Sequence, residues 1–141
     1  MLIDKLHRYL KENNPDLLLQ LEEDGKVTEY LSNKINAIEG LLNQPDKEQP
    51  AYIIEGACMD ILTQDLRPSK FNYISAILEE EFDTAYRQLQ KSGTLQFEVI
   101  NLVKYCQLFF DAIGFTEENE DNKELQFAIT GAIGEYLERN K

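Results

Sequence analysis

The chain is poor in the residues that most catalytic and metal sites require. Its 141 residues include one histidine, His7, and two cysteines, Cys58 and Cys106. Zinc sites, HExxH centres and the Glu-x-x-His pairs of di-iron bundles need more histidines or paired cysteines than this. A Ser-His-Asp triad would have to use His7, and the sequence has no Gly-x-Ser-x-Gly elbow. We therefore predict that the protein is not an enzyme and has no catalytic residues, metal or cofactor.

Glycine-rich loops and long apolar runs are also absent. The seven glycines stand singly, so neither GxGxxG nor GxxxxGK[ST], the common phosphate-binding motifs, occurs. No run approaches the ~18 apolar residues of a membrane-spanning helix. Charged residues interrupt the N-terminal segment, where a signal peptide would be apolar. We expect a cytoplasmic protein with reduced cysteines, and both thiols should be buried because they lie among apolar residues at helical spacing.

Positive charge is scarce as well. The chain has 14 Lys and Arg against 26 Asp and Glu, a formal net charge of −12. Nucleic acid and anionic membranes bind clustered basic residues, so we expect neither as a direct partner. The hydrophobic content of 43% is that of a globular chain, and the length corresponds to one domain with one core. We predict a single helical domain over residues 1–141.

Apolar residues recur at intervals of three and four along nearly the whole chain, which indicates amphipathic helices and not strands. Residues 43–49 are predicted to form a loop, and a helix should restart at Pro50 with one continuous apolar face. That face consists of Ile53, Ile54, Ala57, Cys58, Ile61 and Leu62. The longest helix should run from Lys70 to about Lys91. The fold class is all-α, a single-domain bundle of six to seven mostly antiparallel helices.

Helix boundaries carry residues typical of N-caps. Ser69 precedes the longest helix, where its hydroxyl should accept a hydrogen bond from the amide of Asn72. Thr94 is predicted to cap the next helix. Asp121, followed three residues later by Glu124, has the spacing of a capping box for the last helix.

Two glycines, Gly131 and Gly134, lie inside the last predicted helix. Each costs about 1 kcal/mol relative to alanine in a helix interior. Their presence therefore predicts that a neighbouring helix approaches closely at these positions, with contact to a ligand as the less favoured alternative.

Carboxylates gather in three runs, at residues 22–24, 79–83 and 117–121. A run of charge is commonly a solvated face, and solubility explains it simply. Glu79 and Asp83 are four residues apart, where like charges repel on a helix and where two carboxylates could chelate a divalent cation. The last run lacks the glycine and the closing glutamate of an EF-hand.

The alternative interpretation is that these acids form a recognition surface, because a strongly negative domain attracts basic partners and raises association rates. The candidate binding residues are Glu79, Glu80 and Asp83 in the second run and Glu117, Glu118 and Glu120 in the third. Arg67 and Lys70 form a basic interruption at a helix start, where an anion could bind. Two solvated charges at a capped turn explain that pair more simply.

Several short segments resemble a known family. They are Leu66-Arg-Pro-Ser-Lys-Phe-Asn-Tyr-Ile74 running on to Glu80-Glu81-Phe82, Cys106 with Phe109 or Phe110, Thr130-Gly131-x-Ile133 with Leu137-Glu138, and Tyr9-Leu10-Lys11-Glu12 followed by Pro15. In this respect the chain is similar to a small family of unknown function from Bacteroidetes, often encoded with conjugative transposons. The resemblance implies an all-helical fold, carries no catalytic residues, and favours regulatory, mimicry or immunity roles.

The leading hypothesis is a non-enzymatic, acidic protein-interaction module with a basic protein partner, regulatory or associated with a mobile element. One alternative is an immunity or DNA-mimic protein. Another is a homodimer formed through an apolar face such as Phe97, Tyr105 and Phe109. The last is a carboxylate-metal enzyme that uses Glu79 and Asp83.

Overall fold

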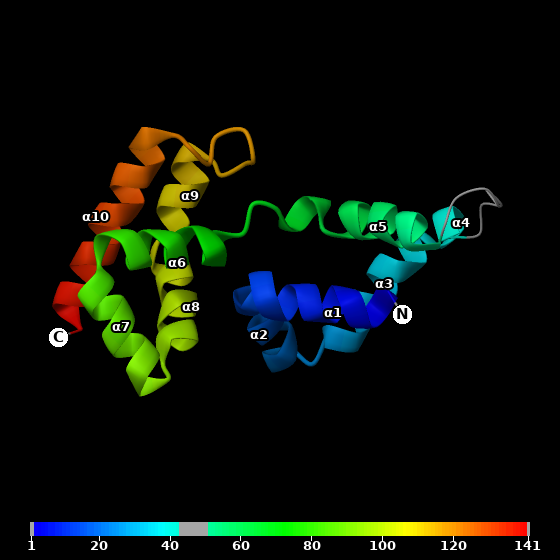
Figure 1. Ribbon diagram of the computed structural model, residues 1–141, viewed down its shortest axis with the longest axis horizontal. Helices are drawn as coiled ribbons and strands as arrows, with labels where there is room; N and C mark the ends of the chain where they lie inside the picture. The colour runs from blue at the N-terminus through cyan, green and yellow to red at the C-terminus, as the bar shows by residue number, and fades with distance from the viewer. Residues whose placement is uncertain (1, 43–50, 141) are drawn as a thin grey trace. The chain divides into compact units, whose positions relative to one another are not determined.

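The computed structural model describes residues 2–42 and 51–140; for residues 41, 42 and 51 it describes the backbone and not the side chains. Over these residues the chain is helical and contains no strand (Figure 1), which confirms the all-α prediction. The predicted loop at 43–49 and the restart at Pro50 lie outside the described residues. The predicted number of helices is too low because three predicted helices are each divided in two, at Ile38, Phe82 and Cys106.

Two compact units make up the chain, Met1–Arg67 (unit 1) and Pro68–Lys141 (unit 2). Each has its own cluster of buried apolar side chains, so the structure has two cores where the chain length predicts one. Two such units can unfold together or separately. The single-domain assignment therefore stays a prediction that unfolding measurements can decide.

Unit 1 is built around its first helix. It contains α1 (Leu2–Asn13), α2 (Pro15–Glu23), α3 (Val27–Ala37), α4 (Glu39–Leu42), α5 (Ala51–Leu62) and the 3₁₀ turn η1 (Gln64–Leu66). Helix α1 packs against α2, α3 and α5, and its Leu6 and Leu10 are fully buried. Asn14, between α1 and α2, is also buried, and its side-chain amide donates to the Leu66 carbonyl at 3.4 Å.

Ion pairs in unit 1 connect segments that are distant in sequence. Lys5 of α1 pairs with Glu55 of α5 at 2.8 Å. Lys34 of α3 pairs with Asp65 of η1 at 2.7 Å. Both pairs are partly exposed to solvent, and ion pairs of this kind contribute little to stability.

The apolar face predicted for α5 is only half buried. Cys58 and Leu62 lie in the core of unit 1 and Ile54 packs beside them. Ile53 and Ile61 are 43% and 44% exposed. The predicted face is too wide because i and i+1 positions on a helix are about 100° apart, and only one of the two rows faces α1.

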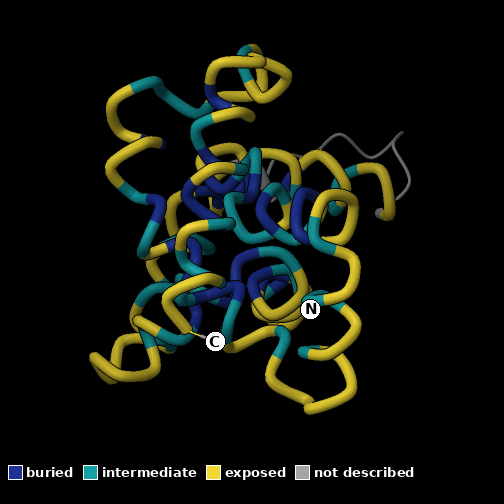
Figure 2. Tube along the Cα trace, turned by 90° about the vertical axis from the view of Figure 1, so that its left-hand side faces the viewer, coloured by how far each residue is buried: buried dark blue, intermediate teal, exposed yellow. Residues whose placement is uncertain are grey.

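Unit 2 is arranged around α8. It contains α6 (Lys70–Glu81), α7 (Asp83–Ser92), α8 (Leu95–Tyr105), α9 (Gln107–Ile113) and α10 (Lys123–Arg139). Helix α8 packs against all four other helices, and its Val99 and Leu102 are completely buried. Buried or half-buried positions along the chain alternate with exposed ones at helical spacing (Figure 2), as amphipathic helices require.

Of the caps predicted at Ser69 and Thr94 only the first is confirmed, and the prediction of buried cysteines is confirmed. Ser69 Oγ accepts from the Asn72 amide at 3.0 Å, as predicted. Thr94 does not cap α8, because its hydroxyl instead shares a 2.7 Å hydrogen bond with that of Ser92. Both cysteines are free and buried, as predicted, and burial raises the pKa of the Cys106 thiol to about 11.

Candidate functional site

A break between two helices at Phe82 lies beside a surface groove of unit 2. The predicted helix from Lys70 to Lys91 is wrong, because α6 ends at Glu81 and α7 begins at Asp83. Phe82 itself has φ −132° and ψ 49°. Its amide donates to the Leu78 carbonyl at 3.0 Å, and its carbonyl accepts from the Tyr86 amide at 2.9 Å. Both helices therefore keep their terminal hydrogen bonds across the break.

The break also separates Glu79 from Asp83. The two carboxylates no longer share one helix, so the four-residue spacing that suggested a chelating pair does not apply. Asp83 lies in the first turn of α7, where negative charge is favourable, and pairs with Arg87 at 3.2 Å.

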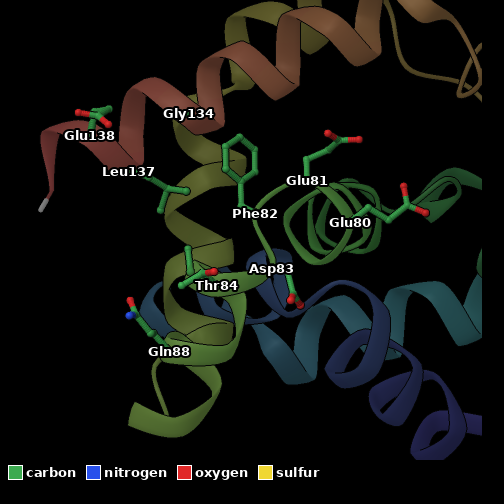
Figure 3. A pocket seen from close by; sticks show the side chains of 10 residues that line it. Glu80, Glu81, Phe82, Asp83, Thr84, Gln88, Gly134, Leu137 and Glu138 are labelled. Carbon is green, nitrogen blue, oxygen red and sulfur yellow. The ribbon is translucent and has the colours of Figure 1, made fainter.

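A groove lies between α7 and α10. Both helices pack on α6 and α8, and the space of about 870 Å³ between them is open to solvent. Its floor is mainly apolar: Phe82 and Ala85 at the start of α7, Gly134 and Leu137 on α10. In Figure 3 the Phe82 ring points toward Gly134, and Leu137 extends from α10 toward α7. Thr84 and Gln88 complete the α7 side.

Carboxylates stand at the two ends of this apolar floor. Glu80 and Glu81, the last residues of α6, lie on one side of the Phe82 ring, and Glu138 lies beyond Leu137 (Figure 3). Glu80 and Glu81 are exposed, and within the described chain neither makes an ion pair. The groove therefore combines an apolar centre with acidic ends.

The two glycines of α10 differ in their surroundings. A Cβ at Gly134 would meet the Phe82 ring at 3.6 Å, which is an ordinary van der Waals distance, and no helix backbone lies closer. A Cβ at Gly131 would meet nothing within 4 Å. The predicted close approach of a helix is therefore wrong at Gly131, and at Gly134 a single aromatic ring takes its place.

The third acidic run lies on a tightly bonded turn between α9 and α10. Asn119 organises it: the side chain donates to the Gly114 carbonyl at 2.7 Å and accepts from the Thr116 amide at 2.6 Å. Glu117, Glu118 and Glu120 are left exposed on the outside of the turn. The acids are evident from the sequence, whereas Asn119 is not, because its hydrogen-bond partners depend on how the turn closes.

The cap of α10 is shifted by one residue from the prediction. Asn122 Oδ1, and not Asp121, accepts from the Leu125 amide at 3.0 Å. The turn thus precedes the first residue of α10, whereas the groove uses its last two turns. None of Glu117, Glu118 and Glu120 lines the groove, so the third acidic run does not join the second there.

A comparison with known families now identifies the chain's relatives. A family model described as a domain of unknown function (DUF1896) matches residues 3–141. The chain belongs to this family. The match covers both units, and it agrees with the resemblance to an uncharacterised family. No curated protein and no solved structure matches the chain.

In this DUF1896 chain the basic pair is divided between the units. Arg67, in unit 1, donates to the carbonyls of Thr63 and Asp60 at 3.3 and 3.2 Å and so caps the end of α5. Lys70, in unit 2, lies 5.4 Å from the centre of the Phe110 ring. Each cation is thus engaged within its own unit.

Part of the aromatic face proposed to form a homodimer packs against other residues of unit 2. Phe97 is 60% exposed and Phe109 40% exposed. Tyr105 instead packs edge-on against Tyr136, with ring centres 5.3 Å apart. The exposed part of the face is therefore smaller than the sequence suggests.

The described part of this DUF1896 chain offers few other sites. His7 is exposed on α1. Within residues 2–42 and 51–140, no group of three or more His, Cys, Asp or Glu side chains could hold a metal ion. None of the described helices has the length and apolarity needed to cross a bilayer.

Proposed function

We propose that this chain is a non-enzymatic protein-interaction module that binds a basic partner through the groove of unit 2. The observation that carries the proposal is the apolar floor with Glu80 and Glu81 at one end and Glu138 at the other. An apolar centre surrounded by polar or charged groups is typical of protein interfaces. Carboxylates around it favour basic partners and repel acidic ones.

The position of Glu79, Glu80 and Glu81 supports this proposal. All three lie in the last turn of α6, which contains no basic residue. Negative charge is unfavourable at a helix C-terminus, because the helix dipole already concentrates negative charge there. A cationic side chain from a partner would offset both this effect and the mutual repulsion. Departures from a local rule of this kind are expected at functional sites.

A second candidate is an immunity or DNA-mimic protein. The turn held by Asn119 favours it, because that turn presents Glu117, Glu118 and Glu120 on a rigid surface. Such a protein would engage its basic partner through the turn as well as the groove. The cytoplasmic location and the regulatory or mobile-element role remain predictions.

The test is affinity capture from the native host followed by quantitative binding to the recovered partner. We expect Glu80→Lys with Glu81→Lys to weaken binding at least tenfold, and added salt to weaken binding to the unaltered chain. Glu22→Lys with Glu23→Lys, at the end of α2, makes the same charge change in unit 1 and is the matched control. Salt-insensitive binding, or equal loss in both variants, would contradict the proposal.

A further inference from the structure

The groove also restricts the shape of what it binds, because the described residues around it offer no sheet edge with which an extended peptide could pair. Its walls are helices, and the described residues contain no sheet edge. The amide and carbonyl of Phe82, at the centre, both bond within the chain. A peptide leaving water here would have to satisfy its own backbone hydrogen bonds, as a helix does.

The side chains along the groove leave room for a helix. The α7 side presents Thr84, Ala85 and Gln88; Gln88 is four residues from Thr84 and three from Ala85, so it shares an edge of the helix with both. The α10 side presents Gly134 and Leu137, again three apart. Small residues on both edges let a third helix approach closely. Helix α7 itself has no fully buried residue, although its sequence is strongly amphipathic.

We infer that the groove binds an amphipathic helix of the partner, with apolar side chains seated between Phe82 and Leu137 and Lys or Arg toward Glu80, Glu81 and Glu138. This inference rests on the proposed function and specifies the partner's form. The long stems of Lys and Arg would cover the edges of the apolar floor while their charges reach the carboxylates. A second copy of the chain is a poor occupant, since each unit has seven Lys and Arg against thirteen Asp and Glu, a net charge of −6.

Two synthetic peptides of identical Leu and Lys composition test the shape requirement. One places leucine at intervals of three and four residues and forms an amphipathic helix, and the other alternates leucine and lysine as a strand would. Fluorescence anisotropy with the full chain should show the helical peptide binding at least tenfold more tightly. Equal binding of the two peptides would overturn the inference, because it would show attraction by charge alone.

Two substitutions in α10 provide a matched test of the location. Gly134→Leu places a side chain in the groove, whereas Gly131→Leu places the same side chain where nothing lies within 4 Å. Both replace a helix-interior glycine with a better helix former, so neither should unfold the helix. Circular dichroism checks this. We expect G134L to weaken binding of the helical peptide at least tenfold and G131L to change it less than twofold. Equal effects would place the binding elsewhere and overturn the inference.

The inference and the proposed function can fail separately. If the native partner depends on Glu80 and Glu81 but neither peptide binds, the basic-partner proposal stands and the helix inference is wrong. If binding of the native partner is also insensitive to Glu80→Gln with Glu81→Gln, both are wrong. Glu117→Gln with Glu118→Gln removes the same charge from the turn and is the control for this step. Light scattering at each stage detects self-association, which would overturn the assignment to a partner helix.

Discussion

The two units have the same net charge and use it differently. Each has a net charge of −6, from seven basic and thirteen acidic residues. In unit 1 Lys5 and Lys34 pair with acids 50 and 31 residues away, so charge connects its helices. In unit 2 the ion pairs among the described residues, Asp83–Arg87 and Glu135–Arg139, lie within single helices. The difference indicates that ion pairs connect the helices of unit 1, whereas those described in unit 2 stay within one helix.

The largest expected effect tests whether the two units unfold separately. Leu6→Ala in unit 1 and Leu102→Ala in unit 2 each remove a fully buried side chain, and each should cost about 2–5 kcal/mol of unfolding free energy. Hydrogen exchange followed by mass spectrometry reports both units at once. We expect L6A to raise exchange mainly in unit 1 and L102A mainly in unit 2. A uniform rise in both units would show one cooperative domain and would support the single-domain prediction.

A smaller and opposite effect is expected from the acids at the end of α6. Replacing Glu79 and Glu80 with Gln removes like charges from a helix C-terminus and should stabilise unit 2 by about 0.3–1 kcal/mol at low salt. Replacing Glu55 with Gln in unit 1 removes the pair with Lys5 and should destabilise that unit slightly. Urea titration at two salt concentrations measures both changes. Destabilisation by the α6 substitutions would show that these acids support the fold, as those in unit 1 do.

The stability of the two units should also depend on pH, with opposite signs. The Lys5 ammonium lowers the pKa of Glu55, so the stability from this pair is present near neutral pH and declines as pH falls through that lowered pKa. Burial raises the pKa of Cys106 from about 9 to about 11. Its contribution is therefore complete below pH 9 and declines between about pH 9 and 11.

Thermal unfolding followed from pH 3 to 11 checks both directions. Glu55→Gln should flatten the acid limb, and Cys106→Ala should flatten the alkaline limb. An alkaline limb that is unchanged in Cys106→Ala would assign that limb to other groups, with the tyrosines as the next candidates.

The sequence predicts the helical class and several boundaries because these depend on local chemistry. The Ser69 cap is an example, since its hydrogen-bond partner Asn72 is three residues away. The break at Phe82 is not predictable in this way. Phe82 continues the apolar spacing between Leu78 and Leu89. A single non-helical residue at this position does not interrupt that spacing, so the sequence pattern does not show the break.

The groove is harder still to predict because its parts come from distant segments. Gly134 and Leu137 are about 50 residues from Phe82, and only the packing of α10 on α6 and α8 brings them together. Of the predicted binding residues, Glu80 and Asp83 line the groove and Glu79 does not. The sequence offers no local signal for the helix end at Glu81, because the three consecutive acids at 79–81 are unfavourable at a helix C-terminus.

The break at Phe82 also has a consequence for how this surface can change. Because α6 and α7 each keep their own terminal hydrogen bonds, the angle between them depends on two torsion angles of one residue. A substitution at this position is therefore expected to alter the width of the groove, and because Phe82 also packs against the core of unit 2 it links the fit of the surface to the packing beneath it.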